Sequence, residues 1–350
     1  MNRTIKAVVF EKPGQITLKT FHLPPCGPEE IICKTIYSFV SPGTELRILG
    51  GQKESKGRFP LIPGYAWVGR VVETGANLRG WDVGEMVTGR NPLPVPGINA
   101  LWGGQASLHR VEVSGYDCVL KLPADADPWH YVHAEVAAIS WRGTSIAYPA
   151  PGETAVVIGQ GIIGAFAARW LIYHKTKVMV VDLEESRLKQ ARKWGAAAAF
   201  NGREPDVREQ ILNRCPGGVD IVIEASASLS GVKLAGSLLR QPAPRVLSSN
   251  YPIADMHTNA HLWPRLVLLA TYSQTLETEP GGLFNTEGAV VLKPGDRTVG
   301  DRREVIERIR CGDLPISDIV EAPVPVEDAP AAYARLRDNP AQHNALAFRW

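Results

Sequence analysis

The feature that most restricts the fold of this chain is one glycine-rich turn. Four apolar residues, 155–158, run directly into the string Gly159-Gln160-Gly161-Ile162-Ile163-Gly164. After this string, apolar residues recur at helical spacing as far as Leu171. A second apolar run, residues 178–181, ends at Asp182, 18 residues after Gly164. A buried strand, a tight turn, a helix and another buried strand predict a βαβ unit of a parallel sheet.

In this context the spacing G-x-G-x-x-G is typical of a dinucleotide-binding turn. Gly159 permits the tight turn, Gly161 lets backbone amides approach a pyrophosphate, and Gly164 lets the helix pack closely on its strand. Ile162 and Ile163 open the helix, whose N-terminus faces the anion. The alternative is a structural domain of the same kind with no ligand.

Asp182 indicates which nucleotide the turn binds. At the end of the second strand its carboxylate would accept hydrogen bonds from both ribose hydroxyls and would repel a 2′-phosphate. The sequence therefore predicts NAD in preference to NADP. Arg187, five residues later, is expected near the ribose, and it or Arg203 would serve a phosphate if NADP were bound instead.

The rest of the chain predicts two domains. Short strands broken by Gly and Pro, at 7–10, 31–37 and 68–73, favour a compact antiparallel barrel or sandwich with few helices. Further apolar runs at 220–224 and 245–247 continue the parallel sheet. We predict a doubly wound α/β domain at 144–285 and a mostly β domain at 1–143 and 286–350. Residues 281–300 are expected to form a loop or hairpin, and 302–310 a helix.

Composition excludes several classes of partner. The 350 residues hold 38 Lys+Arg against 36 Asp+Glu, a net charge of +2, so neither nucleic acid nor an acidic membrane is an expected partner. The five cysteines include no C-x-x-C pair, which favours reduced thiols over a disulfide framework or a cysteine-rich zinc lobe. No run of 18 uninterrupted apolar residues occurs, so we expect a cytoplasmic protein that neither spans a membrane nor is secreted.

Over essentially its whole length the chain resembles the medium-chain dehydrogenase/reductase superfamily, the relatives of zinc alcohol dehydrogenases. The likeness rests on residues 63–75, on Thr44-Glu45, on the glycine turn and on residues 329–336, which match the pattern A-x-x-A-Y-x-x-L. The resemblance implies a Rossmann domain beside a mostly β GroES-like catalytic domain. It also implies an NAD-dependent oxidoreductase with a small-molecule substrate, and a homodimer.

The zinc ligands of that superfamily do not carry over. The positions of its ligand cysteine, its G-H-E histidine and its third ligand correspond to Pro42, Tyr65 and Ser140. Ser140 stands four residues before Thr144, the threonine that the resemblance places at the opening of the nicotinamide-side helix and in contact with the cofactor. Residues 91–104 hold no cysteine, so the structural zinc lobe is missing as well. We predict a zinc-free enzyme, similar to the bacteriochlorophyllide-dehydrogenase-like branch.

Without a metal, a fixed donor must meet the negative charge that develops on the reacting oxygen. Tyr65 is the candidate for this role, and the alternative is an aromatic ring that fills the space of the metal. Thr44 matches the proton-relaying residue of zinc relatives, Arg47 falls where their relay histidine lies, and Glu45 is expected to be structural.

Other titratable and aromatic residues are weaker candidates. His109, His133 and Glu135 are expected near the walls of the cleft, although a lone histidine is more often a packed or exposed residue than an acid–base group. Three tryptophans would line an apolar substrate pocket or pack in the core: Trp102, Trp129 and Trp141.

The predicted function is an NAD(H)-dependent, zinc-independent dehydrogenase that interconverts a secondary alcohol and a ketone. One alternative is a reductase of enones or quinones, whose members usually prefer NADPH and lack an acidic residue at the strand end. The other alternative is a non-enzymatic protein that keeps only the nucleotide site.

Overall fold

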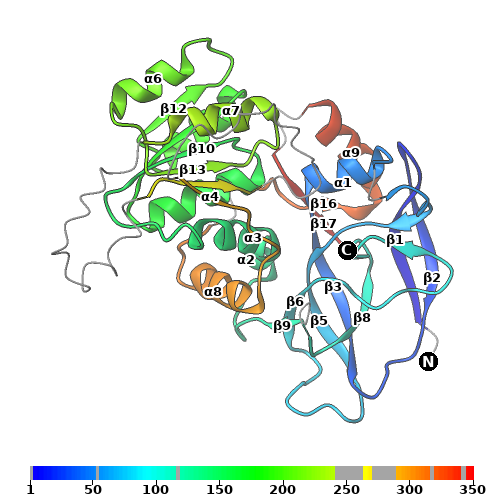
Figure 1. Ribbon diagram of the computed structural model, residues 1–350. Coiled ribbons are helices and arrows are strands. Elements are labelled where there is room, and N and C mark those ends of the chain that lie inside the picture. The colour runs from blue at the N-terminus through cyan, green and yellow to red at the C-terminus, as the bar shows by residue number, and fades with distance from the viewer. Residues whose placement is uncertain are drawn as a thin grey trace. The chain divides into compact units, whose positions relative to one another are not determined.

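The computed structural model describes residues 3–52, 55–115, 119–240, 263–269, 289–315, 319–339 and 344–350. By its internal contacts the chain divides into two compact units (Figure 1). We call Ile139–Arg297 the central unit, and Met1–Ala138 together with Thr298–Trp350 the split unit. The domain boundaries at 143/144 and 285/286 stay predictions, and residue 285 lies outside the described residues.

The central unit is built on a parallel sheet, as the βαβ pattern predicts. The described strands pair in the order β12-β11-β10-β13-β14-β15, and every pair is parallel. This order runs outward in both directions from β10, which is the doubly wound arrangement. The strands are β10 (Thr154–Ile158), β11 (Lys177–Asp182), β12 (Ala198–Asn201), β13 (Ile221–Glu224), β14 (Arg265–Leu268) and β15 (Val290–Leu292).

Two predictions for this part of the chain need comment. The hairpin or loop expected over 281–300 is confirmed at 293–298, which hold no helix or strand, and is wrong at Val290–Leu292, which forms a parallel edge strand beside β14. The strand predicted at 245–247 lies outside the described residues.

Helices of the central unit pack their apolar stripes on the sheet. Ile211 of α6 and Val232 of α7 share one buried cluster with Val156 and Val222 of the central strands, which accounts for much of the core. The helices are α4 (Ile162–Tyr173), α5 (Glu185–Lys193), α6 (Val207–Arg214), α7 (Leu229–Leu238) and, running across the division between the units, α3 (Ala134–Ser145).

The split unit is mostly antiparallel β structure. One sheet has the order β2-β1-β4-β7, and the other has the order β16-β17-β3-β5-β6-β9 with β8 paired to β3. The strands are β1 (Arg3–Lys12), β2 (Gln15–Leu23), β3 (Glu30–Val40), β4 (Leu61–Ile62), β5 (Ala66–Thr74), β6 (Met86–Gly89), β7 (Asn99–Ala100), β8 (Leu108–Glu112), β9 (Leu120–Lys121), β16 (Val324–Pro325) and β17 (Leu346–Arg349). Together the two units confirm the predicted fold class.

Few helices accompany these sheets, as expected. They are α1 (Pro42–Leu49), α2 (Pro128–Tyr131), α8 (Val299–Arg310), η4 (Val326–Asp328) and α9 (Ala329–Asp338). Helix α8 begins three residues before the predicted start at 302. The reason is a capping box, in which the Thr298 hydroxyl accepts the amide of Asp301 and the Asp301 carboxylate accepts the amide of Thr298.

Within the described ranges, no helix combines the length and the apolar character that crossing a membrane requires. The cytoplasmic location and the homodimer stay predictions.

Candidate functional site

The glycine turn of the central unit owes its shape to positions where a side chain would collide. Gly159 has a φ of +88°, and a Cβ there would lie 2.7 Å from the amide nitrogen of Ser226. A Cβ on Gly164 would overlap the carbonyl oxygen of Gly159. At Gly161, by contrast, a Cβ would meet no atom within 4 Å. Gly159 and Gly164 are therefore needed to close the turn, whereas Gly161 borders open space.

The N-terminus of α4 is shaped to take an anion. Gly161 is the N-cap, in an extended conformation, and no side chain caps the helix. The first amides of a helix have no carbonyl partner within it, so those of Ile162 and Ile163 are available to a bound group. The turn also lies where β10 and β13 pair side by side (Figure 1) and the strand order reverses, which is where such sheets bind nucleotides.

Asp182 ends β11 beside this turn, as predicted. Its carboxylate is 8% exposed and accepts the backbone amides of Gln160 at 2.5 Å and Glu184 at 2.9 Å. Nη1 of Arg187 lies 3.8 Å from the same carboxylate. A carboxylate offers about four acceptor positions, so Asp182 can hold the turn and still accept ribose hydroxyls. The role in fixing Gln160 was not predicted. Arg203 instead pairs with Glu184, at 2.9 Å.

Two buried acceptors show that the turn suits a ligand with hydroxyl or amide donors. Within the described chain, Oε1 of Gln160 and Oε2 of Glu224 are buried without a hydrogen-bond partner. Glu224 ends β13, its other oxygen accepts the amide of Ser226, and burial raises the pKa of its carboxyl group. Unsatisfied buried acceptors are costly, and a nucleotide would provide donors for them. The residues present therefore fit a dinucleotide.

Thr144 is placed differently from the prediction. It lies in the last turn of α3, which begins ten residues earlier at Ala134, and so it does not open a helix. Its hydroxyl donates to the carbonyls of Ser140 and Trp141, a bond that suits threonine inside a helix. Ser140 is fully buried, and its hydroxyl donates to the carbonyl of Ile163 at 2.8 Å. Contact of Thr144 with the cofactor stays a prediction.

In the split unit, the structure brings the two predicted catalytic residues together. Tyr65 follows β4 and is 5% exposed, and its hydroxyl donates to Oγ of Ser41 at 2.8 Å. Thr44 lies in the first turn of α1, near enough to the phenol to lower its pKa slightly. Ser41 was not predicted as a site residue, although it precedes the Pro42 that starts α1. Burial raises the pKa of Tyr65, so the phenol is protonated at neutral pH.

Glu45 is hydrogen-bonded to the backbone of this cluster at Ser41. It is fully buried, and its carboxylate accepts the hydroxyl of Tyr333 at 2.5 Å, the amide of Ser41 at 2.9 Å and Nε2 of Gln105 at 3.3 Å. Burial raises the pKa of Glu45 to about 7, against the lowering effect of these bonds. Its role is structural, as expected, because it ties α1 to α9, which carries Tyr333.

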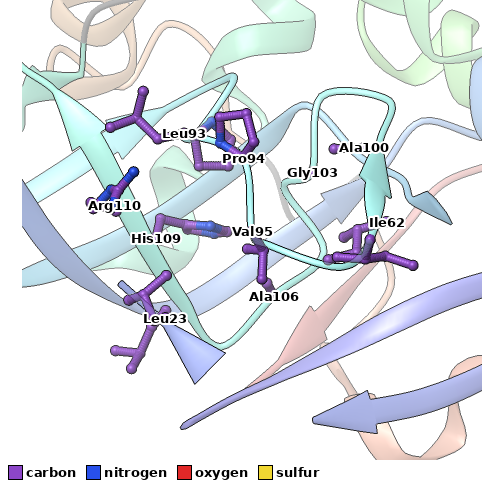
Figure 2. A pocket seen from close by; sticks show the side chains of 13 residues that line it. Leu23, Ile62, Leu93, Pro94, Val95, Ala100, Gly103, Ala106, His109 and Arg110 are labelled. Atoms are coloured by element: carbon purple, nitrogen blue, oxygen red, sulfur yellow. The ribbon is translucent and has the colours of Figure 1, made fainter. Parts of the chain in front are cut away.

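His109 is a packed core residue. It is 1% exposed on β8, its ring lies 4.3 Å from that of Trp67, and burial lowers its pKa to about 3. Figure 2 shows it beside a narrow apolar pocket beneath the loop that carries Pro94 and Val95. A neutral imidazole in this setting is no general acid at physiological pH.

The remaining candidates also serve packing. Glu135 forms an ion pair with Arg302 in which both side chains are 1% exposed, and His133 is fully buried. Trp129 packs edge-on against the ring of Tyr37, and Trp141 against that of Trp170. Trp102 is the exception, because it contacts Tyr65 edge-on at 5.4 Å between ring centroids.

Comparison with known proteins adds a family. A family model described as zinc-binding dehydrogenase matches residues 162–247. L-threonine 3-dehydrogenase of Streptomyces avermitilis is 31% identical over 243 residues, which cover 63% of this chain and 70% of that protein. The chain belongs to the medium-chain dehydrogenase/reductase superfamily. It is an alcohol- or polyol-dehydrogenase-like oxidoreductase of that superfamily.

Solved structures of the superfamily share the fold. An alcohol dehydrogenase of Escherichia coli, complexed with NADH, has a TM-score of 0.81 at 19% identity, covering 99% of each chain. A Sinorhizobium meliloti protein bound to NADP has a TM-score of 0.80 at 21% identity, covering 99% of this chain and 100% of that one. Both nicotinamide nucleotides thus occur among these structures. In the described part of our chain, no three His, Cys, Asp or Glu side chains are grouped as a metal site requires.

Proposed function

We propose that this protein is a zinc-independent, NAD(H)-dependent oxidoreductase that interconverts a secondary alcohol and a ketone of a small or mid-sized metabolite. The observation that carries the proposal is the hydrogen bond from the buried Tyr65 hydroxyl to Oγ of Ser41. Tyr65 stands at the position where the resemblance puts a histidine ligand of zinc. A hydroxyl group fixed in this way can stabilise the charge that a metal stabilises in relatives.

The donors at the three ligand positions do not fit a catalytic zinc ion. Such an ion takes three protein ligands, usually His, Cys or carboxylate, and keeps one position open. Pro42 has no side-chain donor, the hydroxyl of Tyr65 bonds Ser41, and the hydroxyl of Ser140 bonds a carbonyl. We therefore derive the reaction without a metal.

The chain's own task is to hold the reacting oxygen and to move one proton. A bound nicotinamide supplies or accepts the hydride. As a hydride adds to a ketone, the carbonyl electron pair moves to oxygen, and Tyr65 donates its proton to that oxygen. The phenolate that is left would regain its proton from Ser41, whose oxygen lies 2.8 Å from the phenol, as Ser41 takes one from water. Alcohol oxidation is the reverse of these steps.

The geometry of the central unit supports NAD as the nucleotide. The amides at the start of α4 would hold the pyrophosphate, and Asp182 would accept the ribose hydroxyls. Arg187 lies against the carboxylate of Asp182 and is oriented towards that charge. A 2′-phosphate would meet the carboxylate as a like charge.

Replacing Tyr65→Phe tests the proposal, because it deletes only the hydroxyl. We expect kcat to fall roughly 10²–10³-fold, with NADH affinity and stability close to wild type. The matched control is Tyr131→Phe, which removes the hydroxyl of another buried tyrosine of the split unit and should leave kcat unchanged. The assay offers NADH or NAD with secondary alcohols, ketones, enones and quinones.

Each outcome has a clear meaning. Wild-type turnover in Tyr65→Phe would remove this hydroxyl from the mechanism. Turnover confined to enones or quinones would replace the proposal with a reductase of those compounds, and NADH binding without any turnover would leave a nucleotide-binding protein. About one zinc per chain, lost together with activity on chelation, would contradict zinc independence.

A further inference from the structure

A fully buried glutamine connects the segments that carry Tyr65 and Ser41. Gln105 lies between β7 and β8, and its side chain is 0% exposed. Its backbone amide donates to the carbonyl of Pro63 at 2.9 Å, and a Cβ on Gly64 would lie 2.6 Å from its Cγ. The side chain of Gln105 therefore packs directly against the residue that precedes Tyr65.

The side-chain amide of Gln105 is held in one orientation by its hydrogen bonds. Its Oε1 accepts the hydroxyl of Ser38 at 2.5 Å. Its Nε2 donates to the carbonyl of Phe39 at 3.1 Å and to Oε2 of Glu45 at 3.3 Å. A carbonyl oxygen can only accept, so Nε2 and not Oε1 must face Phe39. The amide thus joins the end of β3 to helix α1.

The contact with Glu45 extends this connection to Ser41. The other oxygen of that carboxylate, Oε1, accepts the backbone amide of Ser41 at 2.9 Å, and Oγ of Ser41 accepts the hydroxyl of Tyr65. Gln105 is therefore connected to both partners of this last hydrogen bond, to one through Glu45 and to the other through Gly64. Because buried side chains are closely packed, a change in the amide is transmitted to both partners.

We propose that Gln105 is a positioning residue of the proposed active site, and that it holds the Tyr65 hydroxyl in the place from which it donates its proton. This inference rests on the proposed function. Gln105 acts through its neighbours, because its side chain keeps Gly64 and Glu45 at a fixed separation. A misplacement of about 1 Å between groups that must react can lower turnover by about 100-fold.

A double-mutant cycle separates positioning from stability. Gln105→Met nearly keeps the length of the side chain and its packing on Gly64, but it removes the amide. We expect it to lower kcat roughly 10–100-fold, with KM and NADH affinity close to wild type. In a Tyr65→Phe background it should not lower kcat further, because the hydroxyl that it positions is already absent. A residue needed only for stability would have the same effect in both backgrounds.

The matched control is Thr35→Val. The buried hydroxyl of Thr35, also on β3, donates to the carbonyl of Ala106, the residue after Gln105, at 2.6 Å. Its removal deletes a neighbouring buried hydrogen bond that does not belong to the connection described above. Thr35→Val should lower stability and leave kcat unchanged.

A second measurement needs no turnover. In protein labelled with fluorotyrosine, the fluorine NMR resonance of Tyr65 is identified by its loss in Tyr65→Phe. Gln105→Met should shift this resonance, whereas Thr35→Val should not. A shift in a protein that turns over no ketone or alcohol would support the positioning of Tyr65 by Gln105 and would refute the proposed function.

Ser38→Ala carries the test if Gln105→Met does not fold. It removes the donor to Oε1 of the amide and should give a smaller fall in kcat, again only where the Tyr65 hydroxyl is present. The inference is overturned if neither kcat nor the resonance changes, if kcat falls equally in both backgrounds, or if the control shifts the resonance as much. Any of these results beside a large effect of Tyr65→Phe would leave the proposed function intact.

Discussion

In the central unit the glycine turn is made of backbone. In the split unit the cluster around Tyr65 is made of side chains. The turn consists of glycines and helix amides inside one βαβ segment that ends at Asp182. The cluster joins Ser41, Tyr65 and Trp102, which lie on separate stretches of chain. Backbone amides bind a pyrophosphate, and almost every residue carries one. The sequence therefore has to specify only glycines, which leave those amides accessible.

This difference determines which substitutions disturb each site. A single added methyl group can disturb the turn, because its atoms are already in contact. The cluster is sensitive to a loss of side-chain volume, because each of its side chains is packed on another. The four predictions below use this contrast, and they run from the largest expected effect to the smallest.

If Tyr65 is both packed and reactive, two substitutions can distinguish the contribution of its ring to stability from the contribution of its hydroxyl to turnover. Tyr65→Ala should lower the free energy of unfolding by about 3–5 kcal/mol, because it leaves a cavity beside Trp102 and Arg90. Tyr65→Phe fills that space and should be nearly as stable as the wild type. Urea denaturation measures both. Equal stability of the alanine variant would show that the cluster is not packed as described.

Glu45 makes the stability of the split unit depend on pH. Burial raises its pKa from 4.5 to about 7, so the folded chain holds a proton that the unfolded chain has released. Its stabilising contribution is present below pH 4.5 and is lost as the pH rises to 7, by about 3 kcal/mol. Glu45→Gln does not titrate and should differ from the wild type by an amount that changes over this window. Parallel unfolding curves against pH would contradict the prediction.

For the turn, the sharpest change is one methyl group. Gly164→Ala should cost about 2–3 kcal/mol of stability, since the new Cβ overlaps a carbonyl oxygen that cannot move freely. Gly161→Ala is the control, because its Cβ enters open space and should leave folding intact while weakening NADH binding. Thermal denaturation measures the loss of stability, and nucleotide titration measures the loss of NADH affinity. A silent Gly164→Ala would mean that the helix does not lie this close to the turn.

The smallest expected effect concerns the choice between nucleotides. NADH should bind more tightly than NADPH by about 1–3 kcal/mol, because Asp182 repels a 2′-phosphate. Asp182→Ala should narrow this gap, measured by calorimetric titration. Arg187→Ala is the companion variant. It should not lower the affinity for NADPH if Arg187 does not bind a phosphate. Equal binding of both nucleotides by the wild type would refute the assignment.

Much of the fold followed from local patterns. Periodicity located β10, α4 and β11, and the strand predicted at 7–10 lies within β1. The errors fall where a neighbour decides the outcome. Thr144 was expected to open a helix, but the apolar face of α3 extends it back to Ala134. Residues 289–292 are an apolar run whose strand was missed, and pairing with β14 gives them their place in the parallel sheet.

The candidate site divides in the same way. The turn formed by Gly159, Gly161 and Gly164 and the position of Asp182 beside it were predicted, because each requires a residue type at a fixed spacing; their contact with a nucleotide stays a prediction. Tyr65 and Thr44 were catalytic candidates only by resemblance, and that role stays a prediction. Ser41 was missed, since a serine before a helix is unremarkable until its distance to the Tyr65 hydroxyl is known.

The sequence by itself determined that a tight glycine turn follows a buried strand and that Asp182 ends the next strand; it also carries the resemblance that puts Pro42, Tyr65 and Ser140 at zinc-ligand positions. These are statements about residue type and short-range order, which backbone sterics and strand alternation turn directly into structure. Only the tertiary structure decided that Asp182 also holds Gln160, that Glu45 is tied to Tyr333, and that Arg90 stacks on Tyr65. Such contacts join segments far apart in the chain, and their partners are chosen by packing, which no local pattern records.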